Sequence, residues 1–275
     1  MQDEKEANVT DSLPLWYGIY GDAYAQDEPA FFDAKDFAWA QQLKAIYPAL
    51  KEQLQPLMSS HEAGFLPYFD PSIQFPPNNW KTISFMAWGK PDYASLERFP
   101  EVERLLSQVP GLVSASLSLL EPGSRILPHT GETNAVFRVH LGMNIPAGLP
   151  LCGFQVKEET RAWQNGELLI FLDAYRHAAF NESGQRRYVL ILDIMRAEFQ
   201  HRTYRVCTHV LGILTAYVVV GLLVKMLGLN SGGQDKGFPV WFKWLVVTAF
   251  QSVWMIYLPI HKRLRLKRLF GVLKR

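Results

Sequence analysis

Cysteine is scarce in this chain of 275 residues, which contains only Cys152 and Cys207. Two distant cysteines, one of them inside an apolar run, do not make a disulfide framework, so we expect a reducing compartment. Phosphate-binding glycine loops, cysteine-based metal motifs and internal repeats are missing as well. Nothing in the sequence therefore supports P-loop nucleotide chemistry, a zinc-finger site or a repeat architecture.

A large charge of either sign and a secretory leader are also lacking. The chain has 28 Lys and Arg residues against 26 Asp and Glu residues, a net charge of +2. A balance this close argues against a nucleic-acid partner. Residues 1–8 are acidic and polar, which is not the pattern of a secretory signal. We expect residues 1–12 to be disordered and residues 13–200 to form a globular domain.

Two stretches near the C-terminus have almost no charge. Residues 206–224 contain no Asp, Glu, Lys or Arg, and residues 240–260 are interrupted only by Lys243 and Gln251. Each run is long enough to cross a bilayer core, which takes ~20 helical residues. Their apolarity and the tryptophans of the second run favour two transmembrane helices within residues 201–261. A re-entrant or interfacial helix pair, or two buried helices in a soluble fold, are the alternatives.

Basic residues flank this hairpin on both outer sides. Three arginines precede the first run, and residues 262–275 contain Lys and Arg but no acidic residue. The connecting loop has a single basic residue, Lys236, opposed by Asp235. Because positively charged flanks stay in the cytoplasm, we expect the globular domain and the basic tail to be cytoplasmic. The tail also suits the surface of an anionic leaflet.

The middle of the chain carries histidines and arginines at informative distances. His129 lies in a Pro-His-Thr-Gly segment, His177 follows later, and Arg187 begins an apolar run that reads as a strand. Strand alternation over residues 136–141 puts Arg138 and His140 on one face and a core of apolar side chains on the other. A non-haem iron site needs neutral nitrogen ligands, and a planar guanidinium clamps a carboxylate. These residues are therefore candidates for an iron site that also holds a dicarboxylic acid.

Five segments between residues 114 and 193 follow one another in a characteristic order. They are Pro-His-x-Gly at 128–131, Arg-x-His-Leu-Gly at 138–142, Trp-x-x-Gly at 163–166, Phe-x-Asp-x-x-x-His at 171–177 and an Arg strand at 187–193. This order resembles the aspartyl/asparaginyl beta-hydroxylase family of 2-oxoglutarate oxygenases. The resemblance implies a mainly β fold, a double-stranded β-helix barrel of the jelly-roll or cupin type with flanking helices, here followed by a transmembrane helical hairpin.

The resemblance also implies roles for individual residues. By position, His129 and His177 would bind Fe(II), and Arg187 with Ser118 would anchor the distal carboxylate of 2-oxoglutarate, the co-substrate used with O2. Arg138 and His140 would line the same pocket and also bind the co-substrate.

The third iron ligand is left open by the sequence. Many iron oxygenases have His-x-Asp, whereas this chain has Gly131 in the acidic position. Water can complete such a site. The nearest carboxylates are Glu132 and Asp173, and Asp173 matches an acidic residue of the family for which an orienting role is plausible.

The resemblance covers both peptide and lipid hydroxylases. Peptide members carry a second Arg two residues before the strand Arg, where this chain has Val136, and they work in the secretory lumen. A barrel anchored on the cytoplasmic side favours an acyl chain of a membrane lipid or another membrane-delivered substrate. The alternatives are a peptidyl aspartyl or asparaginyl beta-hydroxylase and a non-catalytic barrel that binds a metabolite.

Patterns outside these segments predict only a few elements. Helical spacing of apolar residues predicts an amphipathic helix over residues 33–58, with Pro48 as a break or boundary. Residues 67–79 are rich in Pro and Asn and read as a loop. Alternation predicts a strand over residues 80–89, and Pro100 predicts the start of a short helix over residues 101–109.

Overall fold

The structure is a computed structural model that describes residues 13–20, 23–59, 64–226 and 239–272. The expected disorder of residues 1–12 and the end of the basic tail lie outside the described residues.

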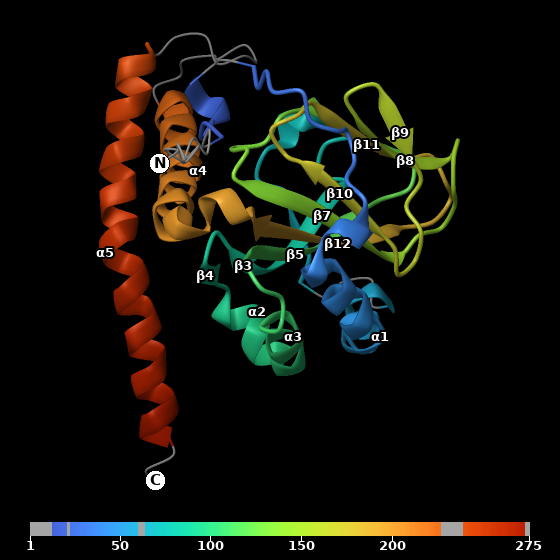
Figure 1. Ribbon diagram of the computed structural model, residues 1–275, viewed down its shortest axis with the longest axis horizontal. Coiled ribbons are helices and arrows are strands. Elements are labelled where there is room, and N and C mark those ends of the chain that lie inside the picture. The colour runs from blue at the N-terminus through green and yellow to red at the C-terminus, as the bar shows by residue number, and fades with distance from the viewer. Residues whose placement is uncertain (1–12, 21–22, 60–63, 227–238, 273–275) are drawn as a thin grey trace, which may run out of the picture.

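Two antiparallel sheets face each other and enclose the core (Figure 1). The larger sheet has the order β1 (Leu66–Pro67), β3 (Trp80–Ala87), β5 (Leu112–Leu120), β12 (Arg187–Met195), β7 (Val136–Asn144) and β10 (Leu168–Leu172), with β4 (Lys90–Pro91) on β3. The smaller sheet has the order β2 (Gln74–Phe75), β6 (Ser124–His129), β11 (His177–Asn181), β8 (Cys152–Val156) and β9 (Glu159–Arg161). This is the predicted double-stranded β-helix.

The central strands of the larger sheet explain why its sequence is apolar on both faces. β12 lies between β5 and β7, and all but one of its residues are buried. One face meets the side chains of the smaller sheet, and helices cover the other. A strand covered on both faces is expected to read as a continuous apolar run. The predicted strand at residues 187–193 is confirmed and continues to Met195.

Three helices pack beneath the larger sheet in the view of Figure 1. They are α1 (Ala38–Ser59), α2 (Tyr93–Arg98) and α3 (Pro100–Leu106), preceded by the 3-10 turns η1 (Gly18–Tyr20) and η2 (Ala34–Asp36). Pro100 begins α3 as predicted, because the first helical position needs no N–H donor. The strand predicted from residue 80 is β3.

The prediction that Pro48 breaks the long helix was wrong. α1 runs through Pro48 and Pro56 without interruption. Both prolines are on the exposed face, where the carbonyls that lose their partner face solvent. The opposite face is held in the core by fully buried leucines, Leu43, Leu50, Leu54 and Leu57. Residues 67–79, predicted as loop, also contribute the end of β1, the turn η3 (Pro71–Ile73) and β2.

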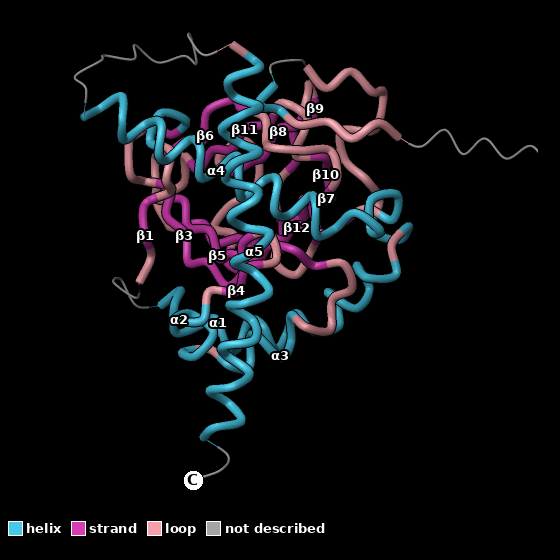
Figure 2. Tube along the Cα trace, turned by 90° about the vertical axis from the view of Figure 1, so that its left-hand side faces the viewer, coloured by secondary structure: helices cyan, strands magenta, loops and turns pink. Residues whose placement is uncertain are grey.

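Two long helices follow the barrel, and both are long and apolar enough to cross a membrane over residues Ala197–Val220 and Val240–Ile260. The turn η4 (Ala197–Arg202) leads into α4 (Thr203–Met226), and α5 (Val240–Val272) returns antiparallel beside it. Figure 2 shows α5 as the outermost element, in front of the sheets. α5 continues to Val272, so the described part of the basic tail is a helical extension of the second apolar run.

The two helices differ in how much protein covers them. Half of the first candidate span is buried inside the protein, against 11% of the second. The first turns of α4 share a core with the end of the barrel, where Val206 and Val210 pack in one cluster with Val113, Val136 and Met195. The first turns of α4 thus pack against the end of the barrel, whereas α5 has an exposed apolar surface.

Candidate active site

The two predicted iron ligands lie directly opposite each other. His129 ends β6, His177 begins β11, and the two residues are paired in the antiparallel register of the smaller sheet. Side chains of directly paired residues share one face and lie close together. The centroids of the two imidazole rings are 4.2 Å apart. Residues separated by 48 positions in the chain are therefore brought together by strand pairing alone.

Each imidazole ring is oriented by a hydrogen bond to the backbone carbonyl two residues before it. The Nδ1 atom of His129 lies 2.8 Å from the carbonyl of Leu127, and Nδ1 of His177 lies 2.8 Å from the carbonyl of Tyr175. A carbonyl only accepts, so each Nδ1 carries the proton and each Nε2 keeps its lone pair. Burial lowers the pKa of His129 to about 4 and holds the pKa of His177 well below its usual range. Both rings are neutral, as metal ligands must be.

A carboxylate fills the place that Gly131 leaves open. The amide of Gly131 donates to the carbonyl of Asp173, and a Cβ on Gly131 would lie 1.6 Å from Oδ2 of Asp173. Oδ1 of Asp173 is 3.5 Å from Nε2 of His177. Oδ2 is buried and has no hydrogen-bond partner among the described residues. The glycine thus makes room for an acidic side chain from the turn between β10 and β11.

Arg138 holds this aspartate in place. Its guanidinium donates to Asp173 and, through Nε at 2.7 Å and Nη2 at 3.1 Å, to Asp193, which is directly opposite on β12. Arg138, predicted to line the co-substrate pocket, thus forms two ion pairs. Burial raises the pKa of Asp173, with Glu132 and Asp193 adding to the rise. A cation beside these carboxylates lowers the cost of their charge.

The described residues offer this pair of imidazoles and no larger metal cluster. No group of three or more His, Cys, Asp or Glu side chains in residues 13–20, 23–59, 64–226 and 239–272 is arranged to hold a metal ion. The neutral rings, the unpartnered oxygen of Asp173 and the surplus of carboxylates nevertheless fit a divalent cation, with water at the remaining positions.

A buried cation lies on the facing sheet. Arg187 begins β12, is 1% exposed, and forms no ion pair with any residue that the structure describes. Nη1 is 3.4 Å from the hydroxyl of Ser118, and Nε has no hydrogen-bond partner among the described residues. Burial lowers the pKa of Arg187 to about 10. A buried guanidinium with an unsatisfied donor is expected to bind an anion, and a carboxylate matches its geometry.

Two tryptophans that the sequence reasoning missed link the parts of the pocket. The indole N–H of Trp80 donates to Ser118 at 3.0 Å, and its ring lies 6.3 Å from that of His129. The Trp163 ring lies 4.7 Å from the guanidinium of Arg187. In the sequence, Trp80 stands only at the start of a predicted strand and Trp163 only in the Trp-x-x-Gly segment. The polar end of a buried indole, which needs a partner, is the signal that points to such residues.

His140, predicted to line the co-substrate pocket, is buried and neutral. The Trp163 indole donates to Nδ1 of His140 at 3.3 Å, which leaves the ring proton on Nε2. Burial, with Arg187 adding to it, holds the pKa of His140 well below its usual range. The ring lies 4.6 Å from that of Phe154, which in turn contacts His177. His140 can therefore donate a hydrogen bond into the pocket but carries no charge.

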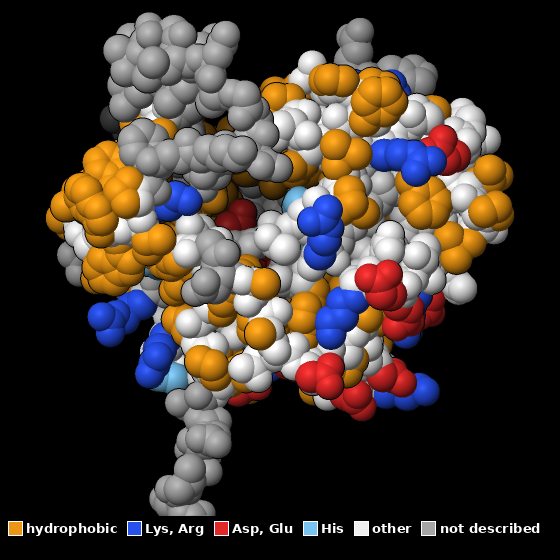
Figure 3. All heavy atoms as spheres, turned by 90° about the horizontal axis from the view of Figure 1, so that it is seen from above, with side chains coloured by type: hydrophobic (Ala, Val, Ile, Leu, Met, Phe, Trp, Pro, Cys, Tyr) orange, Lys and Arg blue, Asp and Glu red, His pale blue; other side chains and the backbone are white. Residues whose placement is uncertain are grey.

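Aromatic rings lead from the His129 side to the surface. Trp80 stacks on Tyr68 with ring centroids 3.7 Å apart, and Tyr68 contacts Phe69, which is 53% exposed. Seen from above, Figure 3 shows a hollow in the molecule with a histidine and an acidic side chain in view. Hydrophobic side chains gather at its left, on the side of α4 and α5. A chain of aromatic contacts thus connects His129 with the exposed ring of Phe69.

We expect Gly131→Ala to disable the metal site. The new Cβ would meet the Asp173 carboxylate, which is buried and held by Arg138 and cannot move without breaking that ion pair. Overpacking of this kind costs about 1 to 3 kcal/mol, and a lost partner around a metal costs about 10- to 100-fold in affinity. Metal titration and thermal unfolding measure both. Gly148→Ala is the control, since nothing lies within 4 Å of its Cβ; equal metal affinity in both variants would contradict the assignment.

Comparison with known proteins gives one family and several relatives. A sequence model described as aspartyl/asparaginyl beta-hydroxylase matches residues 44–197. The chain is 30% identical over 191 residues to the ornithine lipid ester-linked acyl 2-hydroxylase of Rhizobium tropici, covering 68% of this chain and 65% of that relative. It is 28% identical over 125 residues to the aspartyl/asparaginyl beta-hydroxylase of Homo sapiens, covering 44% of this chain and 16% of the relative. A crystal structure of a Pseudomonas putida prolyl-4-hydroxylase aligns with 57% of this chain and 87% of its own, at 14% identity and a TM-score of 0.36.

Proposed function

The chain belongs to the aspartyl/asparaginyl beta-hydroxylase family, and we propose that it is a membrane-anchored oxygenase, dependent on Fe(II) and 2-oxoglutarate, that hydroxylates a C–H bond of a membrane lipid. When bound, Fe(II) and 2-oxoglutarate would supply the activation of O2 that puts one oxygen into the C–H bond, with succinate and CO2 as the other products. The family match and the lipid hydroxylase among the relatives support this proposal.

The residues of the pocket divide this task between the two sheets. His129 and His177 would bind the iron through Nε2, because their Nδ1 protons are held by backbone carbonyls. Asp173 would orient water on the metal through its unpartnered oxygen. On the facing sheet, Arg187 and Ser118 would hold the distal carboxylate of 2-oxoglutarate.

Two further residues would complete the co-substrate pocket. His140 would donate from Nε2 to 2-oxoglutarate, since Nδ1 is occupied by Trp163. Arg138 would act on the co-substrate side only indirectly, by holding Asp173 and Asp193. The surrounding aromatic side chains exclude water from the place where the C–H bond is attacked.

The packing of the hairpin against the barrel is the observation that best supports a lipid substrate. Val136, at the position where the peptide hydroxylases have their second Arg, is fully buried in the cluster that includes Val206 and Val210 of α4. An arginine there would have no access to a substrate. The exposed face of α5 adds a continuous apolar surface beside the barrel, as a membrane-bound enzyme requires. The basic flanks of the hairpin support a cytoplasmic domain.

The proposal is tested with the full chain in lipid vesicles supplied with Fe(II), 2-oxoglutarate and O2. We expect succinate release to be matched by a gain of one oxygen on lipid acyl chains, measured by mass spectrometry. Replacing Val253, Ile256 and Ile260 on the outer face of α5 by Gln should lower this hydroxylation at least tenfold, because anchoring supplies a high local concentration. Iron and 2-oxoglutarate binding should not change, since the pocket is untouched.

The control separates delivery from chemistry. Leu149→Gln with Leu151→Gln removes two exposed leucines from the barrel and should leave vesicle activity intact. Short-chain lipid dispersed in detergent should be hydroxylated equally by all three proteins. Succinate release without any oxidised lipid would exclude a lipid substrate and favour the peptidyl hydroxylase, and absence of any 2-oxoglutarate turnover would favour the non-catalytic barrel.

A further inference from the structure

A cavity of about 560 Å³ lies outside the barrel, where the N-terminal segment, α4 and α5 meet. It is separate from the two histidines, and none of the pocket residues described above lines it. Its walls combine cationic, polar and aromatic side chains, among them Tyr17, Arg202, Arg205, His209, Trp244 and Gln251. Such a mixture is unusual beside an apolar helix pair, because polar groups at membrane depth are costly unless they serve a purpose.

The charge of this cavity is positive and uncompensated. Arg202 and Arg205 line it, no Asp or Glu does, and neither arginine forms an ion pair with a residue in the described part of the chain. The one acidic residue nearby in the sequence, Glu198, pairs with Arg196. Two guanidinium groups without an acidic partner match a phosphate, which takes parallel hydrogen bonds from arginine.

The histidine and the glutamine in the cavity wall already have hydrogen-bond partners within the protein. The Nδ1 atom of His209 is 2.9 Å from the amide oxygen of Gln251, and its Nε2 atom is 3.0 Å from the hydroxyl of Tyr20. The amide nitrogen of Gln251 reaches the carbonyl of Arg205. These bonds account for a histidine and a glutamine inside two apolar runs. Arg202 and Arg205 are the cations left for a ligand, and because Nε of Arg202 bonds to His201, its terminal nitrogens are the ones that remain.

An apolar groove continues from the cavity along α5. A second hollow of about 420 Å³ is lined by Trp241, Trp244, Leu245, Thr248, Ala249 and Ser252. Trp244, Thr248 and Ser252 line both hollows, so the cationic cavity passes directly into the groove. Trp241, Trp244 and Leu245 are more than half exposed. A ligand with an anionic head and an apolar tail would fit a cationic cavity that continues into an apolar groove.

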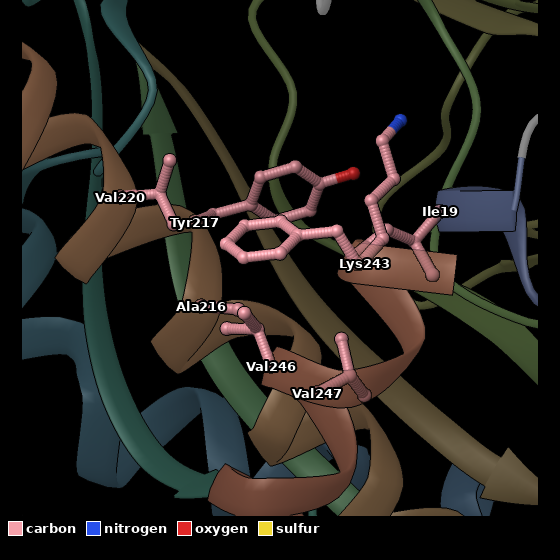
Figure 4. Close-up of a pocket in the computed structure, with 8 residues that line it drawn as sticks. Ile19, Ala216, Tyr217, Val220, Lys243, Val246 and Val247 are labelled. Carbon is pink, nitrogen blue, oxygen red and sulfur yellow. The ribbon is translucent and has the colours of Figure 1, made fainter. Parts of the chain in front are cut away.

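A third hollow lacks the features that a lipid site needs. It lies nearer the other end of the hairpin, between Ile19, Tyr217 and Val247, with the Lys243 amine directed away from the apolar side chains (Figure 4). Its volume is about 50 Å³, less than a tenth of the 560 Å³ of the cationic cavity. It offers neither room for a headgroup nor paired cations.

We propose that the cavity between the N-terminal segment, α4 and α5 binds an anionic glycerophospholipid, with its phosphate on Arg202 and Arg205 and an acyl chain in the groove beside Trp244. This lipid is a structural partner and not the molecule that is hydroxylated. The site does not rest on the proposed reaction, because no residue of the iron pocket takes part. It places the headgroup layer of the membrane at the level of the first turn of α4.

The bound lipid would contact the same segment that covers the loop after His129. Tyr17 forms a β-bridge with Thr133, and its ring lies 4.2 Å from that of His209 in the cavity wall. The amide of Gly18 also donates to the carbonyl of Glu132. A lipid that fills the cavity thus supports the chain next to Gly131 from the membrane side.

The test uses the full chain in a neutral detergent and counts retained lipids by native mass spectrometry. Phosphatidylglycerol should be retained in preference to phosphatidylcholine. Arg202→Gln with Arg205→Gln should weaken phosphatidylglycerol retention at least tenfold, since each cation near a lipid surface contributes to binding. Lys35→Gln with Lys51→Gln removes the same charge from the barrel side and should change nothing. Equal retention in the two double variants would overturn the proposal.

Two further measurements keep the outcome clear of misfolding and of small anions. Thr248→Phe leaves both arginines in place but blocks the passage between cavity and groove, so it should also weaken phosphatidylglycerol retention. Unchanged retention in this variant would remove the acyl groove from the site. Inorganic phosphate in excess should fail to displace the lipid; displacement by phosphate alone would show a small-anion site instead of a lipid site.

Discussion

Alanine at His129 or at His177 is expected to abolish Fe(II) binding and turnover. Each ring supplies one of two imidazole nitrogens, and no third His, Cys, Asp or Glu ligand is arranged with them in the described residues. Loss of a partner that merely surrounds a metal costs about 10- to 100-fold in affinity, so loss of a ligand should exceed about 100-fold. Metal titration and 2-oxoglutarate-dependent succinate release measure the two effects.

The control for this experiment is a histidine outside the pocket. His201 is exposed in η4, and its ring is hydrogen-bonded to Arg202. His201→Ala should keep iron affinity and turnover at the level of the unaltered chain. Circular dichroism should show a folded barrel in all three variants. Turnover that persists in His129→Ala or His177→Ala would disprove the iron site proposed for β6 and β11.

Arg187→Ala should raise the concentration of 2-oxoglutarate needed for half-maximal turnover by about 30-fold or more. A charged partner of a buried carboxylate contributes about 2 to 5 kcal/mol, and 1.4 kcal/mol is a factor of 10. The unsatisfied Nε of Arg187 and its bond to Ser118 place that partner in the barrel. Arg187→Lys should recover only part of the affinity, because an ammonium group does not form the paired hydrogen bonds.

The neighbouring arginine provides the matched control for Arg187. Arg186 pairs with Glu121 on the other side of the strand, so Arg186→Ala should leave the 2-oxoglutarate requirement unchanged. Iron affinity should be similar in both variants, because the imidazoles are on the facing sheet. An unchanged 2-oxoglutarate requirement in Arg187→Ala would mean that another group holds the carboxylate, and His140 would be the next to test.

The sequence predicted the strands of the barrel better than the contacts between them. Alternation and motif order gave the strands that begin at Val136 and Arg187, because a period of two is a local property. The ion pairs of Arg138 are not local. They depend on Asp193 lying opposite it in the register of β7 and β12, and on Asp173 filling the space beside Gly131. No spacing along the chain reports such packing.

For the hairpin too, the sequence predicted the elements but not their contacts. Composition predicted two long apolar helices, and both are present. Composition could not predict which part of each helix meets protein, since apolarity does not distinguish lipid from a protein neighbour. The structure gives the first turns of α4 a protein neighbour, with Val206 and Cys207 packed against the barrel end. The two cysteines are buried thiols outside any disulfide, as their number predicted.

The connection between β12 and α4 is short and buried, which limits how the barrel can be oriented relative to the two long helices. One residue, Arg196, separates the last strand from η4, and it is 4% exposed. Its backbone N–H donates to Ala135, and its guanidinium bonds to Glu28 and Glu198. A flexible linker would let the barrel tumble above the bilayer and sample every orientation. This joint instead fixes the barrel to α4, so a bilayer around the two helices would meet one fixed side of the barrel.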